Sequence, residues 1–196
     1  PSTIQSYLAT NATAFTGTSA NDILSISTAA TLSPLVMTAV ILDGGTGTNT
    51  LSVQDGSSIA SAIVLNFPNL TFDATGVTLT NDVTLSASQN QLFTGTITAA
   101  GTGANSEKIT IVGDGAITTL AGIEEYNIGD DSTNARTVTV SNAGTSVTAN
   151  STTDAITFNL GGLAYTGTLT GDGTVDDILS LSTGADISGG TITNVG

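Results

Sequence analysis

The fold of this chain is decided by a short unit that first appears as Asn21-Asp22-Ile23-Leu24-Ser25-Ile26, where polar residues precede an apolar–hydroxyl–apolar triplet. The unit returns at residues 48–53, 81–85, 106–111, 135–140, 153–158 and 176–181. Branched apolar and hydroxyl side chains that alternate in this way are typical of β-strands, because they suit a pleated, half-buried surface. The unit therefore predicts a series of short strands separated by polar turns.

The spacing of the unit predicts how these strands are arranged. The first apolar residues of the triplets stand at positions 24, 51, 83, 109, 138, 156 and 179. A loose period of this kind, with Gly, Asn and Asp at the turns, is typical of a parallel β-solenoid. We expect an all-β, parallel β-solenoid of seven coils with two or three strands each, forming one elongated domain over residues 1–196. The alternative is an antiparallel β-sandwich or jelly roll, because short strands at regular spacing also fit those folds. Further strands are expected at residues 39–42, 63–65, 70–72, 77–79, 117–120 and 123–128.

The composition excludes several classes of activity. Sixteen Asp and Glu residues stand against two Lys and Arg, which gives a formal charge of −14, and the chain has neither Cys nor His. Disulfides, thiol or imidazole catalysis and metal sites built from Cys or His are therefore excluded. Two cations cannot neutralise a phosphate backbone, so we expect no nucleic-acid binding. The longest apolar stretch, residues 35–42, is too short to span a bilayer, and we expect no membrane insertion.

The sharpest local motif is Gly44-Gly45-Thr46-Gly47-Thr48-Asn49-Thr50-Leu51-Ser52, with degenerate copies that begin at Gly17 and Gly171. It fits the nonapeptide G-G-x-G-x-D-x-apolar-x with Asn49 in place of the aspartate. Over these residues the chain resembles RTX-type secreted bacterial proteins, and its Thr/Ala/Gly-rich style resembles S-layer proteins. The resemblance implies Ca²⁺ held between successive turns and a secreted protein at the cell surface. The alternative is that residues 44–49 form only a tight turn.

Acidic residues at the turns are the other candidate ligands for calcium. Adjacent carboxylates repel each other unless a cation lies between them, and oxygen ligands favour Ca²⁺ over transition metals. The alternative is that these residues are solvated turn residues, a position that Asp favours in any case. The complete set of candidate metal ligands is Asn49, Asp22, Asp130, Asp131, Asp172, Asp176 and Asp177.

From these features we expect a non-enzymatic, extracellular structural protein, such as a subunit of an S-layer, a surface filament or an adhesin stalk. A solenoid has open ends, so the terminal segments 1–14 and 187–196 are candidates for head-to-tail contact or strand donation between copies. One alternative is an adhesin module that binds surface glycans. Another is an ice-binding solenoid with ranks of Thr-x-Thr, although the unequal spacing of the triplets counts against aligned ranks. A third is a polysaccharide-processing enzyme, for which two cations and 4% aromatic residues supply little binding chemistry.

Overall fold

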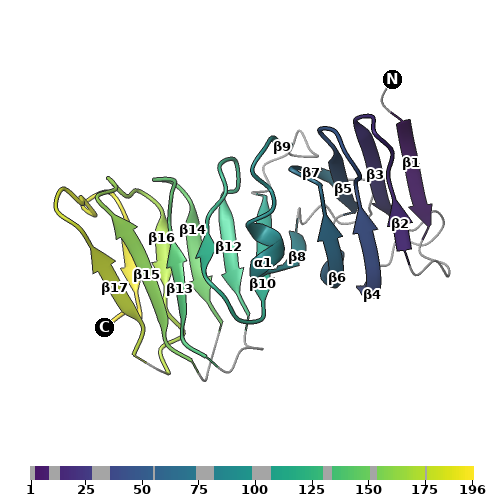
Figure 1. The fold of residues 1–196 in the computed structure, drawn as a ribbon. Coiled ribbons are helices and arrows are strands. Elements are labelled where there is room, and N and C mark those ends of the chain that lie inside the picture. Colours follow the sequence, from purple (N-terminus) through teal and green to yellow (C-terminus); the bar gives the residue numbers. More distant parts are fainter. Residues whose placement is uncertain are drawn as a thin grey trace. The chain divides into compact units, whose positions relative to one another are not determined.

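The computed structural model describes residues 3–8, 14–27, 36–54, 56–73, 82–98, 107–129, 134–150, 154–174 and 176–196. Within these ranges the chain is nearly all β, with eighteen strands and one helix of four residues. Every ladder between the described strands is parallel, and each strand inside a sheet pairs with strands of the preceding and following coils (Figure 1). The chain is therefore a parallel β-solenoid, as the sequence predicts, and the antiparallel alternatives were wrong.

The strands belong to two compact units, which comprise Pro1–Leu85 with Leu92–Glu107, and Ser86–Gln91 with Lys108–Gly196. In the first unit the chain alternates between two sheets, so each coil contributes two strands. One sheet has the order β1-β3-β5-β7-β9 and the other contains β2, β4, β6 and β8. The bounds are β1 Thr3–Leu8, β2 Ala14–Thr16, β3 Asp22–Ser27, β4 Val36–Asp43, β5 Thr50–Gln54, β6 Ser58–Leu65, β7 Asn69–Asp73, β8 Asp82–Ser86 and β9 Ile97–Thr98.

The second unit has the same two-strand coil. Its sheets have the orders β10-β12-β14-β16-β18 and β11-β13-β15-β17. Its helix α1, Ala87–Asn90, begins with a capping box between Ser86 and Gln89. The strand bounds are β10 Lys108–Val112, β11 Ile117–Thr118, β12 Glu125–Ile128, β13 Arg136–Thr139, β14 Ser146–Ala149, β15 Ile156–Gly161, β16 Thr168–Thr170, β17 Ile178–Leu181 and β18 Thr191–Thr193.

The core consists of apolar side chains stacked coil upon coil. Leu24 pairs with Leu51, and Leu51 pairs with Leu70, so the three leucines form one buried row across β3, β5 and β7. In the second unit Val138 and Phe158 occupy equivalent buried positions on β13 and β15. Each buried side chain of this size contributes about 2 kcal/mol. Because successive side chains of a strand point to opposite faces, the hydroxyl residues between them face outward.

The register corrects the period read from the triplets. The second interval between triplets joins Leu51 on β5 to Val83 on β8, which are strands of different sheets. The triplet at residues 156–158 is also aligned differently, because Val138 pairs with Phe158 rather than with Ile156. Equivalent positions of the triplets are therefore not always equivalent positions of the solenoid.

The coils differ in length, and the turns absorb these differences. In the first unit shorter and longer coils alternate. Ile23 pairs with Ile4 of the preceding coil and with Thr50 of the following coil, and Thr50 is further from Ile23 in the sequence than Ile4 is. In the second unit the coils are more nearly equal, as the successive partners Val147, Leu169 and Ile192 show. Strand pairing therefore stays regular while the turn lengths vary.

The other strand predictions hold within shifted bounds. Residues 39–42, 63–65 and 70–72 lie inside β4, β6 and β7. The strand predicted at 117–120 is only the two residues of β11, and the one predicted at 123–128 begins at Glu125. Residues 77–79 lie outside the described residues.

Candidate functional site

The polar residue of the nonapeptide-like motif is the centre of a ladder of hydrogen bonds between coils. Asn49 is fully buried at the turn before β5. Its Oδ1 accepts the backbone N–H of Asp22 from the preceding coil at 2.9 Å, and its Nδ2 donates to the carbonyl of Asn66 in the following coil at 3.0 Å. Asn69 continues the ladder, because its Nδ2 donates to the Asn49 carbonyl and its Oδ1 accepts the N–H of Thr96. The amide side chains therefore tie neighbouring coils together.

The degenerate copies of the motif use a carboxylate in the same place. Asp22, the buried first residue of β3, accepts the N–H of Thr18 at 2.6 Å and its hydroxyl at 2.8 Å. Asp177, buried before β17, accepts the N–H of Ile156 at 2.7 Å and that of Asp172 at 3.0 Å. Burial is the main effect that raises the pKa of the Asp177 carboxyl, against the two hydrogen bonds that lower it.

The glycines of the motif allow successive turns to approach closely. A Cβ on Gly44 would collide with the carbonyl oxygen of Asn66, and one on Gly17 would collide with that of Gly44. Gly45 has a φ of +73°, and a Cβ there would meet the carbonyl oxygen of Thr18. The glycine spacing of the motif is therefore explained by the packing of one turn against the next.

The structure brings some of the predicted calcium ligands together. Asp22 and Asn49 are joined by the hydrogen bond described above, and so are Asp172 and Asp177, whereas Asp176 is exposed. Asp130 and Asp131 lie outside the described residues. Within the described ranges there is no group of three or more acidic residues placed to hold a metal ion. The described contacts use the motif's polar atoms as partners for backbone groups, and calcium binding stays a prediction.

The last coil of the second unit presents an open edge. Strands β17 and β18 are the final strands of their sheets within the described part of the chain. Ile178 is 50% exposed and Leu181 46% exposed. Leu179 and Ile192 continue the rows of Phe158 and Leu169, but they are only half-buried where those two are fully buried. Within the described residues, the apolar side chains of this coil are therefore less buried than those of the preceding coils.

Hydroxyl side chains form straight rows on the outer face of β14, β16 and β18. Ser146 and Thr148 on β14 align with Thr168 and Thr170 on β16, which pair in turn with Thr191 and Thr193 on β18. These ladders contain no bulge, whereas the opposite sheet shifts register at β15. The Thr193 hydroxyl lies 3.3 Å from the Thr170 hydroxyl. No charged residue lies on these three strands.

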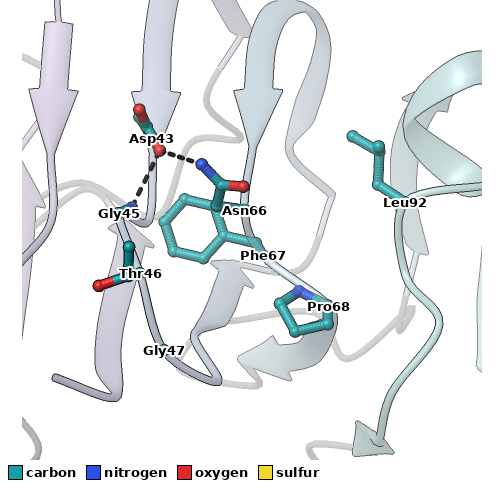
Figure 2. A pocket seen from close by; sticks show the side chains of 8 residues that line it. All are labelled: Asp43, Gly45, Thr46, Gly47, Asn66, Phe67, Pro68 and Leu92. Atoms are coloured by element: carbon teal, nitrogen blue, oxygen red, sulfur yellow. Dashed lines mark hydrogen bonds between the residues drawn. The ribbon is translucent and has the colours of Figure 1, made fainter. Parts of the chain in front are cut away.

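A pocket of about 650 Å³ lies in the first unit, where the turn after β4 meets the turn after β6 (Figure 2). Its lining residues are Asp43, Gly45, Thr46, Gly47, Asn66, Phe67, Pro68 and Leu92. Oδ1 of Asp43 accepts the Gly45 N–H at 2.9 Å and the Asn66 Nδ2 at 2.7 Å. Both hydrogen bonds lower the pKa of the Asp43 carboxyl, and the bond from the Gly45 backbone has the larger effect. The carboxyl is therefore ionised at neutral pH.

Sequence reasoning missed this pocket. Asp43 and Asn66 are 23 residues apart and belong to different coils. Asn66 has a φ of +59°, a left-handed conformation that turns its amide back toward Asp43. An Asn that directly follows a strand is a weak signal for such a turn, and the sequence does not indicate which residue its side chain will contact.

Comparison with family models, with curated proteins and with solved structures found no match. The described helix α1, four residues long, cannot span a membrane, and the described residues contain no other candidate helix.

Proposed function

We propose that this chain is a non-enzymatic structural protein of the cell surface, which assembles by stacking solenoid coils of neighbouring copies. The open edge at β17 and β18 is the observation that supports this proposal. Edge strands carry N–H and C=O groups that can pair with another strand, and half-buried Leu179 and Ile192 provide apolar area for the same contact.

The proposed partner at this edge is the first coil of a second copy. β1 is the other end of its sheet in the first unit, so it also pairs on one side only within the described residues. Stacking β17 and β18 of one copy on β1 and β2 of the next would be a heterologous, head-to-tail contact, which extends into a filament or layer if it does not close. The candidate segments 1–14 and 187–196 contain β1 and β18.

Charge determines the conditions that this assembly needs. A chain of formal charge −14 repels its own copies, and divalent cations in an extracellular medium would screen that repulsion. We propose that Ca²⁺ screens this repulsion at the carboxylates of Asp172 and Asp176, which lie beside the open coil.

Light scattering and negative-stain microscopy of the purified chain, with Ca²⁺ and with EGTA, test the proposal. We expect ordered polymers with Ca²⁺. The double variant Leu179→Lys/Ile192→Lys should stay monomeric, because it places charges on the surface that the neighbour covers. The control Thr137→Lys/Ser141→Lys changes the charge equally at exposed positions away from the edge and should assemble. A chain that is monomeric at high concentration in both media would overturn the proposal.

The rows of hydroxyls on β14, β16 and β18 favour a second candidate function, ice binding. Neighbouring strands lie about 4.8 Å apart and alternate residues about 6.6 Å apart, so the rows form a regular lattice on a rigid sheet. The unequal spacing that counts against this function in the sequence is absorbed by the turns. The coil from Val147 to Leu169 and the slightly longer one from Leu169 to Ile192 both pair in register. Restricted Thr side chains also lose little entropy on binding.

An assay of ice recrystallisation inhibition tests this second candidate. Thr148→Lys/Thr170→Lys interrupts one row on the proposed face and should abolish inhibition. Thr137→Lys/Thr157→Lys, on the outer face of the opposite sheet, should leave it unchanged. Absence of inhibition by the unaltered chain excludes this function.

A further inference from the structure

The first unit carries an exposed apolar surface on the outer side of β4 and β6. Ile41 pairs with Ile63, and Asp43 pairs with Leu65, on two adjacent strands whose Leu42 and Val64 point into the core. Ile41 is 41% exposed, Ile63 54% and Leu65 43%. We call Ile41, Asp43, Ile63 and Leu65 the β4–β6 face. Exposed aliphatic residues that gather in this way mark interaction sites more often than isolated ones do.

The β4–β6 face continues into the pocket described above, because Asp43 belongs to both. Leu92, 40% exposed, is another lining residue, so the pocket has an apolar wall as well as a carboxylate. Figure 2 shows Asp43 and Leu92 on either side of Phe67 and Pro68. The combined surface offers apolar contacts and one fixed negative charge.

The Asp43 charge has no countercharge in its own unit. Both hydrogen bonds reach Oδ1, and among the described residues Oδ2 accepts none. Lys108 and Arg136 are the two basic residues of the chain, and both belong to the second unit. A ligand that brings a cation to Asp43 therefore supplies an interaction that the first unit lacks.

We propose that the β4–β6 face and its pocket bind a cationic, amphipathic segment of another protein. Aliphatic side chains of that segment would cover Ile41, Ile63 and Leu65, and a Lys or Arg side chain would enter the pocket and pair with Asp43. Apolar contact supplies the free energy of binding, and the charge pair fixes orientation and selects against acidic segments.

A second copy of this chain does not fit the same surface. Arg136 is buried and donates from Nη2 to the carbonyl of Gly129, so a copy has only Lys108 to offer. The partner is therefore a different, basic polypeptide, and this inference stands apart from the proposed assembly edge at β17 and β18.

The test uses the full chain and three labelled synthetic peptides of equal length, followed by fluorescence anisotropy. One peptide contains Lys and Leu in amphipathic order, one contains Lys and Ser, and one contains Glu and Leu. We expect the Lys/Leu peptide to bind more tightly than the Lys/Ser peptide, and the Glu/Leu peptide not to bind. Asp43→Asn keeps an acceptor at Oδ1 and should weaken binding of the Lys/Leu peptide about tenfold.

Matched variants separate this surface from general attraction to an acidic chain. Asp186 is another exposed carboxylate, and hydrogen bonds from Ser188 lower its pKa as those from Gly45 and Asn66 do for Asp43. Asp186→Asn should therefore not change binding. Ile63→Thr/Leu65→Thr should weaken binding of the Lys/Leu peptide. Thermal melts confirm that each variant is folded.

Three results would overturn the proposal. The first is an equal loss of affinity for Asp186→Asn and Asp43→Asn, which would show non-specific attraction. The second is equal binding of the Lys/Ser and Lys/Leu peptides, which would show that the apolar face contributes nothing. The third is a change in self-association of Ile63→Thr/Leu65→Thr in sedimentation, which would make the face a contact between copies.

Discussion

Asn49 fixes the position of Asp22 across one whole coil: its side-chain oxygen accepts the Asp22 backbone N–H at 2.9 Å although 27 residues separate the two. The same amide donates to the carbonyl of Asn66, so a single buried side chain links three successive coils. The resemblance to RTX-type nonapeptides that the sequence suggests would place the equivalent residue in a calcium site, which stays a prediction. Here its polar atoms satisfy backbone groups that would otherwise be buried without partners.

Replacing Asn49 should be costly, because Asn49→Ala leaves the Asp22 N–H and the Asn66 carbonyl without this partner. We expect the free energy of unfolding to fall by about 2–4 kcal/mol, measured by urea denaturation. Asn134→Ala, which removes an exposed hydrogen bond to Asp114, should cost less than about 1 kcal/mol. Similar losses in the two variants would mean that the ladder does not stabilise the coils.

Substitutions at two glycines separate backbone strain from the packing of turns. Gly45 and Gly113 have nearly equal φ angles, +73° and +76°, but a Cβ at Gly113 meets nothing within 4 Å. Gly113→Ala should therefore cost only the left-handed strain of about 1–2 kcal/mol. Gly45→Ala also forces a methyl group against the Thr18 carbonyl and should cost about 1–3 kcal/mol more. Equal melting temperatures for the two variants would show that the turns can separate freely.

The buried tyrosines of the second unit should resist ionisation. Tyr126 donates to Oδ1 of Asn90 and accepts the Leu120 N–H, and Tyr165 donates to the Thr145 carbonyl. Burial raises the pKa of both hydroxyls well above their ordinary value of 10. The pKa of each hydroxyl is higher in the folded chain than in the unfolded chain. The stability that the two protonated tyrosines contribute is therefore complete below about pH 10 and is lost as the pH rises further.

An alkaline titration followed by absorbance at the tyrosinate band measures this effect. We expect Tyr126 and Tyr165 to ionise together with unfolding. Ionisation of both residues near pH 10 in a chain that keeps its circular dichroism would contradict the buried environment.

The pH dependence of Asp177 has a definite sign. Burial, the largest effect, raises the pKa of this carboxyl above 3.8, so the protonated form favours the folded state. Its contribution is complete below pH 3.8 and decreases as the pH rises through the raised pKa. Asp177→Asn does not titrate, so the stability of the unaltered chain relative to this variant should be greatest in acid and decrease toward neutral pH.

Urea denaturation of the two proteins at constant ionic strength, at several pH values from acid to neutral, checks this prediction. A relative stability that increases with pH would show that the hydrogen bonds from Ile156 and Asp172 outweigh burial.

The alternation of apolar and hydroxyl residues was enough to predict strands and a parallel solenoid. Residues such as Leu24, Ser25 and Ile26 determine locally which side of a strand is apolar, because side chains point to alternate faces. Glycines and Asx residues before the strands likewise predicted the turns. The register was not predictable, since the short coil from Ile4 to Ile23 and the longer one from Ile23 to Thr50 both pair once their turns absorb the difference.

The candidate sites, like the fold, combine features that the sequence predicts with features that only the tertiary structure shows. The sequence by itself determined the strands, the turns and the acidity of this chain, all of which are properties of single residues and their near neighbours. Only the tertiary structure decided that Asn49 bonds backbone groups, that Asn66 turns back to Asp43 at 2.7 Å, and that Ile41 lies beside Ile63 on an exposed face. The physical reason is that these contacts join different coils, where the pairing of distant backbone segments, rather than local preference, determines which side chains meet.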